Sequence, residues 1–117
     1  MAYLSVEALK DKIITGIQRV GDDELHFKTE DGETYKMFHR QNCCESVYIE
    51  SIVGELDDLL NSPVLMAEEV EQAGDSSSWG TSTWTFYKLA TLKGYVTIRW
   101  LGESNGCYSE SVDFVKE

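Results

Sequence analysis

The stretch TWTFYKLATLKGYVTIRW, residues 83–100, decides the expected fold, because its apolar residues alternate on both sides of a short turn. Alternation with a period of two is typical of a strand that has one buried face. We expect a three-residue loop at positions 92–94, with Gly94 in the left-handed conformation, so that Thr91 pairs with Tyr95. The stretch therefore predicts an antiparallel hairpin.

The register of this hairpin divides its side chains between two faces. It predicts Tyr87 opposite Arg99, and a second turn at 103–106 adds a third strand over residues 107–115 that brings Ser109 beside Arg99 and pairs Trp100 with Tyr108. The apolar face is then expected to hold Trp84, Phe86, Val96, Ile98, Trp100, Val112 and Phe114.

The segment 45–60 changes to a helical period. Its apolar residues recur at helical spacing, with acidic residues on the other side, and Pro63 follows the end of the pattern. We expect a long helix here, packed on one face of the sheet, and a short helix at the N-terminus capped by Ser5. Further strands are expected over 13–20, over 64–70 and on both sides of Asp31-Gly32, and residues 71–80 are expected to form a polar loop. The predicted fold class is α+β, in a single domain over residues 1–117.

The charge balance excludes some classes of partner. The chain has 21 acidic and 10 basic residues, a net charge of -11. Binding to a nucleic-acid polymer takes its affinity from Lys and Arg on phosphates, so no such partner is expected. No apolar run approaches the length that spans a bilayer, and the N-terminus lacks the features of a signal peptide. The three cysteines, two of them adjacent, form a poor disulfide framework, so we expect a cytoplasmic protein without a disulfide.

The predicted row of Tyr87, Arg99 and Ser109 is the first candidate for ligand binding. An aromatic ring stacks on a base, and an arginine holds a phosphate through paired hydrogen bonds. The same residues also suit a solvated sheet face or an interface between two copies of the chain.

The segment 39–45 is the second candidate. Arg40 is expected beside the N-terminus of the predicted helix, a position that favours anions, although a simple helix cap explains the segment as well. A zinc site would need a fourth ligand besides His39, Cys43 and Cys44, and a His39–Cys44 nucleophile pair lacks an orienting residue. No phosphate-binding loop, dinucleotide fingerprint or zinc-protease motif is present. Two-metal chemistry on acidic pairs stays open, but we expect no enzyme active site, no metal and no cofactor.

Several motifs together resemble a family of small phage and prophage proteins, the Thoeris anti-defence 1 sponges. These motifs are QNCCESVYIE at 41–50, SPVLMAEE at 62–69, TWTFYK at 83–88, GYVTIRW at 94–100 and SNG at 104–106. The resemblance implies a protein that binds cyclic ADP-ribose isomers, or cyclic oligonucleotides, in the host cytoplasm and sequesters these immune signals without degrading them. It also implies a homodimer or a larger homo-oligomer. The ligand contacts that it suggests are Arg99, Asn105, Phe86 and Arg40.

Two other functions remain open. An acidic protein can inhibit a host defence protein directly, for example by imitating DNA, and the net charge of -11 favours this reading. The third hypothesis is an enzyme that degrades the signal.

Overall fold

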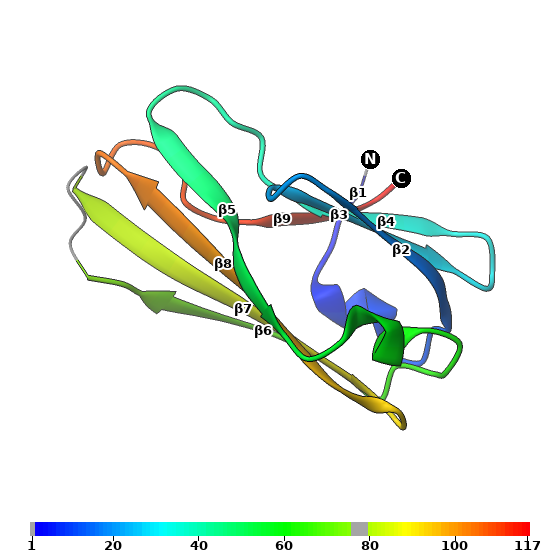
Figure 1. Cartoon of the computed structure of the whole chain (residues 1–117). Coiled ribbons are helices and arrows are strands. Elements are labelled where there is room, and N and C mark those ends of the chain that lie inside the picture. Colours follow the sequence, from blue (N-terminus) through cyan, green and yellow to red (C-terminus); the bar gives the residue numbers. More distant parts are fainter. Residues whose placement is uncertain (1, 76–79) are drawn as a thin grey trace.

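Two antiparallel sheets face each other in the computed structural model, which describes residues 2–75 and 80–117 (Figure 1). Sheet I has the strand order β1-β9-β4-β3-β2, and sheet II has the order β5-β8-β7-β6. The strands of sheet I are β1 (Ala2–Tyr3), β9 (Asp113–Lys116), β4 (Thr34–Phe38), β3 (Glu24–Thr29) and β2 (Ile14–Val20). Those of sheet II are β5 (Glu45–Val53), β8 (Gly94–Ser104), β7 (Thr81–Thr91) and β6 (Met66–Ala73). The fold is a β-sandwich with two short 3-10 helices, η1 (Val6–Leu9) and η2 (Leu56–Leu59).

The predicted long helix over residues 45–60 is wrong, and with it the α+β fold class. This segment forms strand β5 and then the 3-10 helix η2. The ladder between β5 and β8 skips Glu50, so the apolar side chains before and after this bulge no longer alternate regularly. The resulting spacing of Ile49, Ile52, Leu56 and Leu59 imitates the apolar stripe of a helix.

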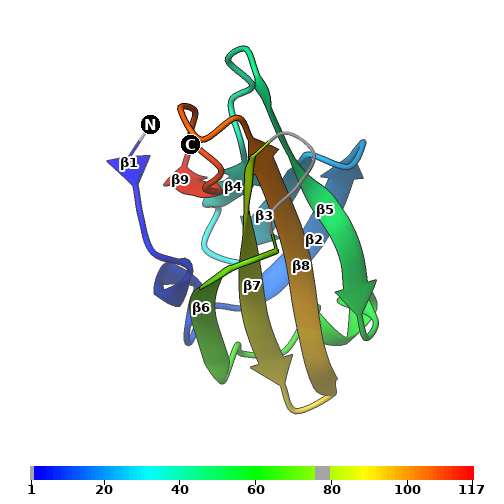
Figure 2. The same ribbon diagram turned by 90° about the vertical axis from the view of Figure 1, so that its left-hand side faces the viewer.

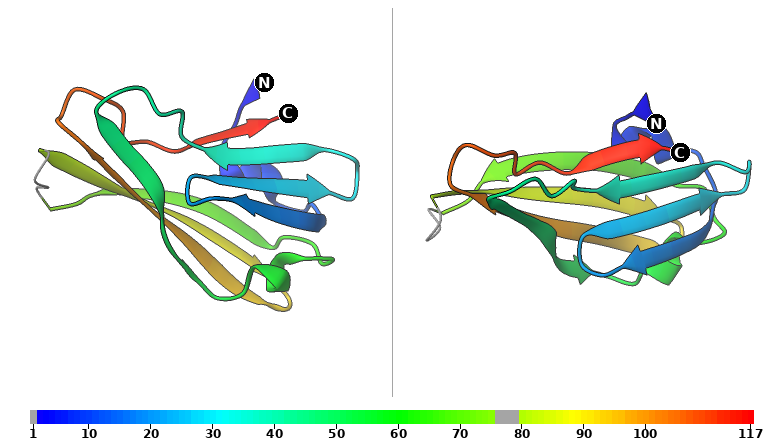
Figure 3. Two further views of the ribbon diagram at one scale, coloured as in Figure 1. Left: turned by 45° about the horizontal axis from the view of Figure 1, so that its top comes forward. Right: turned by 90° about the horizontal axis from the view of Figure 1, so that it is seen from above.

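The core lies between the two sheets (Figure 3). Phe114 of sheet I stacks on Tyr35, with ring centroids 5.6 Å apart. Trp100 of sheet II is fully buried, and its indole Nε1 donates to the sulfur of Met37 in sheet I at 3.3 Å. The largest fully buried side chains besides Trp100 are Tyr87, Phe27, Leu9, Ile14, Leu25, Met37, Leu59, Leu89 and Ile98.

Several local predictions are confirmed. The N-terminal helix is present as the 3-10 helix η1, and the hydroxyl of Ser5 accepts from the amide of Glu7 at 3.2 Å. The hairpin around Asp31-Gly32 joins β3 to β4, and Gly32 has the positive φ of 86° that its turn needs. Strands β2 and β6 lie close to the predicted ranges, although β6 extends to Ala73. The rest of the predicted polar loop includes residues 76–79, which lie outside the described residues. Within the described residues, no helix has the length and apolar character needed to cross a membrane.

The β7–β8 hairpin is present, but its register differs from the prediction by one residue. Thr91 pairs with Gly94 across a turn of two residues, and not with Tyr95. A one-residue shift moves the side chains of one strand to the opposite face of the sheet relative to the other strand. Phe86, and not Tyr87, therefore lies opposite Arg99.

The predicted third strand over residues 107–115 is also wrong. Trp100 pairs with Ile49 of β5 on its far side, so β5 occupies the place expected for the C-terminal strand. The chain leaves β8, crosses to sheet I and pairs there as β9 with β4 and β1. Figure 2 shows β8 between β7 and β5 in sheet II.

Substituting each of two tryptophans tests this register. Trp100→Ala should lower the free energy of unfolding by about 3–5 kcal/mol, because it empties the space between the sheets. Trp84→Ala should cost less than half as much, because Trp84 is only partly buried on the outer face of sheet II. Urea denaturation followed by circular dichroism measures both. Equal losses would contradict the register.

Candidate functional site

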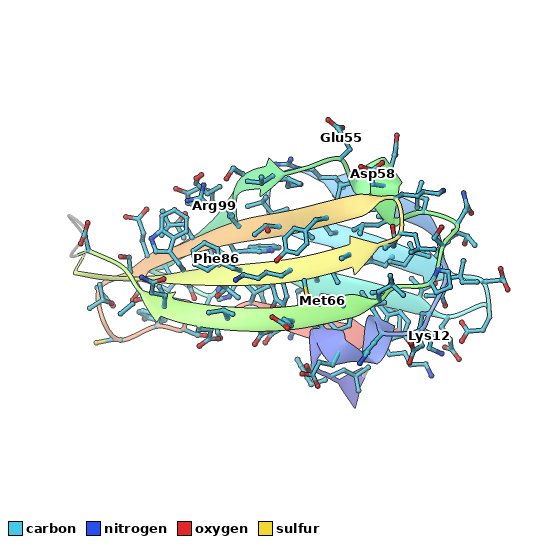
Figure 4. All side chains as sticks on the ribbon, turned by 90° about the horizontal axis from the view of Figure 1, so that it is seen from below. Lys12, Glu55, Asp58, Met66, Phe86 and Arg99 are labelled. Carbon is cyan, nitrogen blue, oxygen red and sulfur yellow. A yellow bond between two sulfur atoms is a disulfide. The ribbon has the colours of Figure 1, made fainter. Side chains whose placement is uncertain are left out.

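The outer face of sheet II carries Phe86 and Arg99 (Figure 4). Trp84, two residues before Phe86 on β7, lies on the same face, and we call these three residues the aromatic–arginine cluster. The rings of Trp84 and Phe86 are nearly parallel, with an angle of 6° between their planes and centroids 5.8 Å apart. The guanidinium carbon of Arg99 lies 5.1 Å from the Trp84 ring centroid and 5.9 Å from that of Phe86. These distances allow a cation–π attraction to both rings.

The pleat of the hairpin brings these three side chains together. Trp84 and Phe86 are two residues apart on β7, so they point to the same face. Arg99, on β8, pairs directly with Phe86. Side chains that are directly opposite in a ladder share a face and lie about 5 Å apart.

Arg99 is only partly engaged by protein groups. Its Nη1 donates to the hydroxyl of Ser51 at 3.3 Å and lies 3.8 Å from the Oε1 of Glu50. Both partners come from β5 at the bulge. Among the described residues, these polar contacts use only one of the three guanidinium nitrogens. The side chain of Arg99 is 37% exposed, so its other donors are accessible to a ligand.

The face around the cluster combines exposed apolar side chains with charged ones. Its exposed apolar residues include Tyr95 at 53% and Val70 at 39%, on strands β8 and β6. The ladder places Lys88, two residues from Phe86 on β7, on the same face as a second cation. Two carboxylates share this face, Glu68 directly opposite Lys88 and Glu103 opposite Ser82. The other apolar side chains on it are Tyr48, Val53, Met66, Ala90 and Leu101.

Tyr87 does not belong to this site, contrary to the prediction. It is fully buried between the sheets, and its hydroxyl donates to the carbonyl of Val112 at 3.5 Å. Burial raises the pKa of Tyr87 far above its usual range, and the neighbouring carboxylate of Glu69 adds to the shift. The shifted register accounts for the difference.

Asn105 and Ser109 lie in the connection between β8 and β9, away from the cluster. Asn105 is six positions beyond Arg99, or roughly 20 Å along an extended strand. Its side-chain oxygen accepts from the amide of Cys107 at 2.9 Å, and the hydroxyl of Ser109 bonds to that of Ser111 at 2.7 Å. The predicted row of Tyr87, Arg99 and Ser109 is therefore not formed.

Arg40 lies in the link between β4 and β5. It is exposed, and it lines a surface hollow together with Asp23, Lys36 and His39. The anion site predicted at a helix N-terminus is absent here, because the strand β5 follows this link. Arg40 is thus on a different part of the surface from the aromatic–arginine cluster.

The same link contains a buried carboxylate. Glu45 accepts from the backbone amides of Cys43 at 2.8 Å and Asn42 at 3.1 Å, and its Oε2 lies 3.4 Å from the Nε2 of His39. Burial alone would raise the pKa of Glu45, but these two amides and His39 together lower it. The Nδ1 of His39 donates to the carbonyl of Ser111 at 2.8 Å. Both nitrogens of His39 therefore have protein partners.

The cysteines differ from the prediction. Cys43 and Cys44 form a disulfide between adjacent residues, so the expectation of three free thiols is wrong. Neither sulfur is then available as a zinc ligand or a nucleophile, while Cys107 is a free, exposed thiol. Within residues 2–75 and 80–117, no three His, Cys, Asp or Glu side chains are grouped so that they could hold a metal ion.

A second carboxylate holds the β8–β9 connection against sheet II. Glu110 accepts from the hydroxyls of Thr83 at 2.8 Å, of Thr81 and of Ser104. The connection approaches so closely that a Cβ at Gly102 would lie 2.4 Å from the carbonyl oxygen of Glu110. Burial favours the neutral acid, but the three hydroxyls outweigh this effect, and the pKa of Glu110 is lowered from 4.5.

This lowered pKa predicts a pH dependence of stability. The contribution of ionised Glu110 is present above the pKa of the unfolded chain and is lost as the pH falls through the lower pKa of the folded protein. Glu110→Gln should therefore lose less stability than the parent between about pH 5 and pH 3. Urea midpoints at several pH values measure this, with Glu30→Gln on the exposed β3–β4 hairpin as the control. If both variants followed the parent curve, Glu110 would have no such role.

Sequence reasoning identified Arg99 and Phe86 but placed them on opposite faces, and it missed Trp84, Glu50 and Ser51 as their neighbours. The period of two on β7 already puts Trp84 beside Phe86. A two-residue turn would have added Arg99 to the pair. Nothing in the sequence pointed to Glu50 and Ser51, because the segment 45–60 resembled a helix.

Comparison with known proteins gives one match. The family model described as a domain of unknown function (DUF7448) matches residues 7–114, which include every element from β2 to β8. Searches of curated proteins and of solved structures found no match.

Proposed function

We propose that this chain, which belongs to the DUF7448 family, binds a nucleotide-type small molecule on the aromatic–arginine cluster and sequesters it without chemical change. One observation carries the proposal: a partly free guanidinium lies against two parallel aromatic rings on an exposed sheet face. A base can stack on an aromatic ring, worth about 1–3 kcal/mol, while the guanidinium pairs with a phosphate.

The electrostatics of the site are compatible with an anionic ligand. The ion pair of Arg99 with Glu50 is long and partly exposed, and such surface pairs contribute at most about 1 kcal/mol. A phosphate that forms two charge-assisted hydrogen bonds can therefore replace Glu50. Salt screens the more distant negative charge of the chain over about 8 Å, and on this face the charge of Lys88 offsets that of Glu68, which lies directly opposite it in the ladder.

The class of ligand follows from the resemblance to the phage sponges. It narrows the proposal to cyclic ADP-ribose isomers, or cyclic oligonucleotides, captured in the host cytoplasm. Each of these small molecules combines bases with phosphates, which is the pair of groups that the cluster suits. The resemblance also supports a homodimer, in which a second copy would cover the open side of the flat site.

Binding without turnover agrees with the groups that surround Arg99. Its polar neighbours are the hydroxyl of Ser51 and the carboxylate of Glu50, and it lies on two aromatic rings. In the part of the chain that the structure describes, both histidines lie elsewhere, on or just after strands of sheet I. The hydroxyl of Ser51 donates to the Oε2 of Glu50 at 3.4 Å, but a carboxylate alone is a weak base toward a serine hydroxyl, and among the described residues no histidine stands beside this pair.

A release experiment tests the function. Cyclic ADP-ribose, its isomers and cyclic dinucleotides are each incubated with the protein, the free ligand is removed, and the complex is heated to unfold the protein. We expect one of them to be retained and then released intact, as measured by mass spectrometry. Release of an altered molecule would make the protein an enzyme, and no retention of any of them would overturn the proposal.

Substitution of Arg99 tests the site. Arg99→Ala should weaken binding by about 1.5–3 kcal/mol, the worth of a hydrogen bond to a charged group, and Arg99→Lys should recover part of this. Arg19→Ala is the matched control, because it removes the same charge from an exposed position on strand β2 of sheet I. Calorimetry on folded variants measures the difference. Equal losses of affinity for Arg99→Ala and Arg19→Ala would show that only the net charge of the protein matters, and would contradict a direct contact between Arg99 and the ligand.

A second candidate function is direct inhibition of a host protein by an acidic surface. The observation that favours it is the net charge of -11. Such binding would be strongest at low salt and would not depend on Trp84 or Phe86. Failure of every nucleotide in the release experiment would favour this function.

A further inference from the structure

We propose that the free edge of β6 is a docking site for an extended basic segment of a partner protein, which adds to sheet II as a fifth strand. β6 is the last strand in its sheet and pairs with β7 over all of its eight residues (Figure 2). Within the described residues, no backbone hydrogen bond joins β6 to any strand other than β7. An edge strand of this length presents unpaired amides and carbonyls to which another strand can bind. This inference does not rest on the proposed nucleotide binding.

The charge of β6 decides what kind of strand fits. The strand carries Glu68, Glu69 and Glu71 and no basic residue, and each of its residues from 68 to 73 is exposed. None of the ion pairs among the described residues involves these three glutamates. A second copy of the chain would bring the same glutamates against them, and like charges on paired strands repel. A strand with lysine or arginine provides the complementary charge.

The face of β6 toward the sandwich adds a polar group that lacks a partner. Glu71 pairs directly with Thr85 of β7, so both side chains point to this face. Thr85 is 1% exposed, and its Oγ1 has no hydrogen-bond partner in the described part of the chain. This hydroxyl lies one strand in from the free edge, behind Glu71, so an added strand that pairs with Glu71 would lie about 10 Å from it.

Part of β6 is already covered, which sets the length of the site. The helix η1 lies beside the start of the strand, where Glu7 and Lys10 line a surface pocket together with residues 65–68. The open portion is therefore residues 69–73. This portion suits a short extended segment with its basic residues on the face shared by Glu69 and Glu71.

The simpler reading is that the glutamates only protect the edge from pairing with other chains. A short labelled peptide of alternating lysine and valine distinguishes the two readings. Its binding is measured by fluorescence anisotropy at about 0.15 M salt, where weak long-range attraction is screened. Amide hydrogen exchange is measured with and without the peptide, because strand addition protects edge amides. We expect saturable binding and slower exchange confined to β6.

A pair of charge reversals provides the decisive comparison. Glu71→Lys should weaken peptide binding by about fivefold or more, while Asp57→Lys, on the exposed surface of η2, should change it by less than about twofold. Both variants change the net charge equally. A difference between their peptide affinities therefore reports a local contact at β6 and not the electrostatic field of the whole protein. Equal weakening, absence of peptide binding, or unchanged exchange in β6 would overturn the proposal and leave the glutamates as edge protection.

Discussion

The pairing of Thr91 with Gly94 is the constraint on which the rest of the structure depends. Because side chains alternate along a strand, this one pair settles which residues of β7 share a face with which residues of β8. It sends Tyr87 and Trp100 into the core, where Trp100 reaches Met37 of sheet I. The same pair turns Arg99 outward, together with two aromatic rings. The core and the candidate site are thus two sides of one register.

Despite its net charge of -11, the chain holds two carboxylates, the buried Glu45 and the partly buried Glu110, in the connections between the sheets, and each has a structural task. Glu45 organises the link from sheet I to sheet II through backbone amides, and Glu110 holds the link back to sheet I through hydroxyls. Hydrogen bonds lower the pKa of both groups despite their burial. The two crossings between the sheets therefore depend on ionised groups and not only on apolar packing.

Much of sheet I and the existence of the β7–β8 hairpin could be predicted, because alternation and turn residues are local signals. The segment 45–60 could not, because a bulge at Glu50 followed by a 3-10 turn produces helical spacing without a helix. Only part of the candidate site could be predicted, because its arrangement also depends on a local detail of the backbone. Arg99 and Phe86 were found from their chemistry, but their proximity depends on a turn length that differs from the expected one by a single residue. Where two turn lengths suit the same residues, the local sequence does not fix the register of a hairpin. Packing of β7 and β8 against sheet I then decides between the two registers.

The two ends of the described chain lie side by side, because β1 pairs with β9 at the edge of sheet I. Figure 1 shows both termini on sheet I, whereas the aromatic–arginine cluster lies on the outer face of the opposite sheet. An anchor attached at either end would hold the molecule by one layer and leave the other layer facing the solvent. The protein is consequently suited to immobilisation on a surface, or to fusion with a reporter at both ends, with its candidate binding face unobstructed.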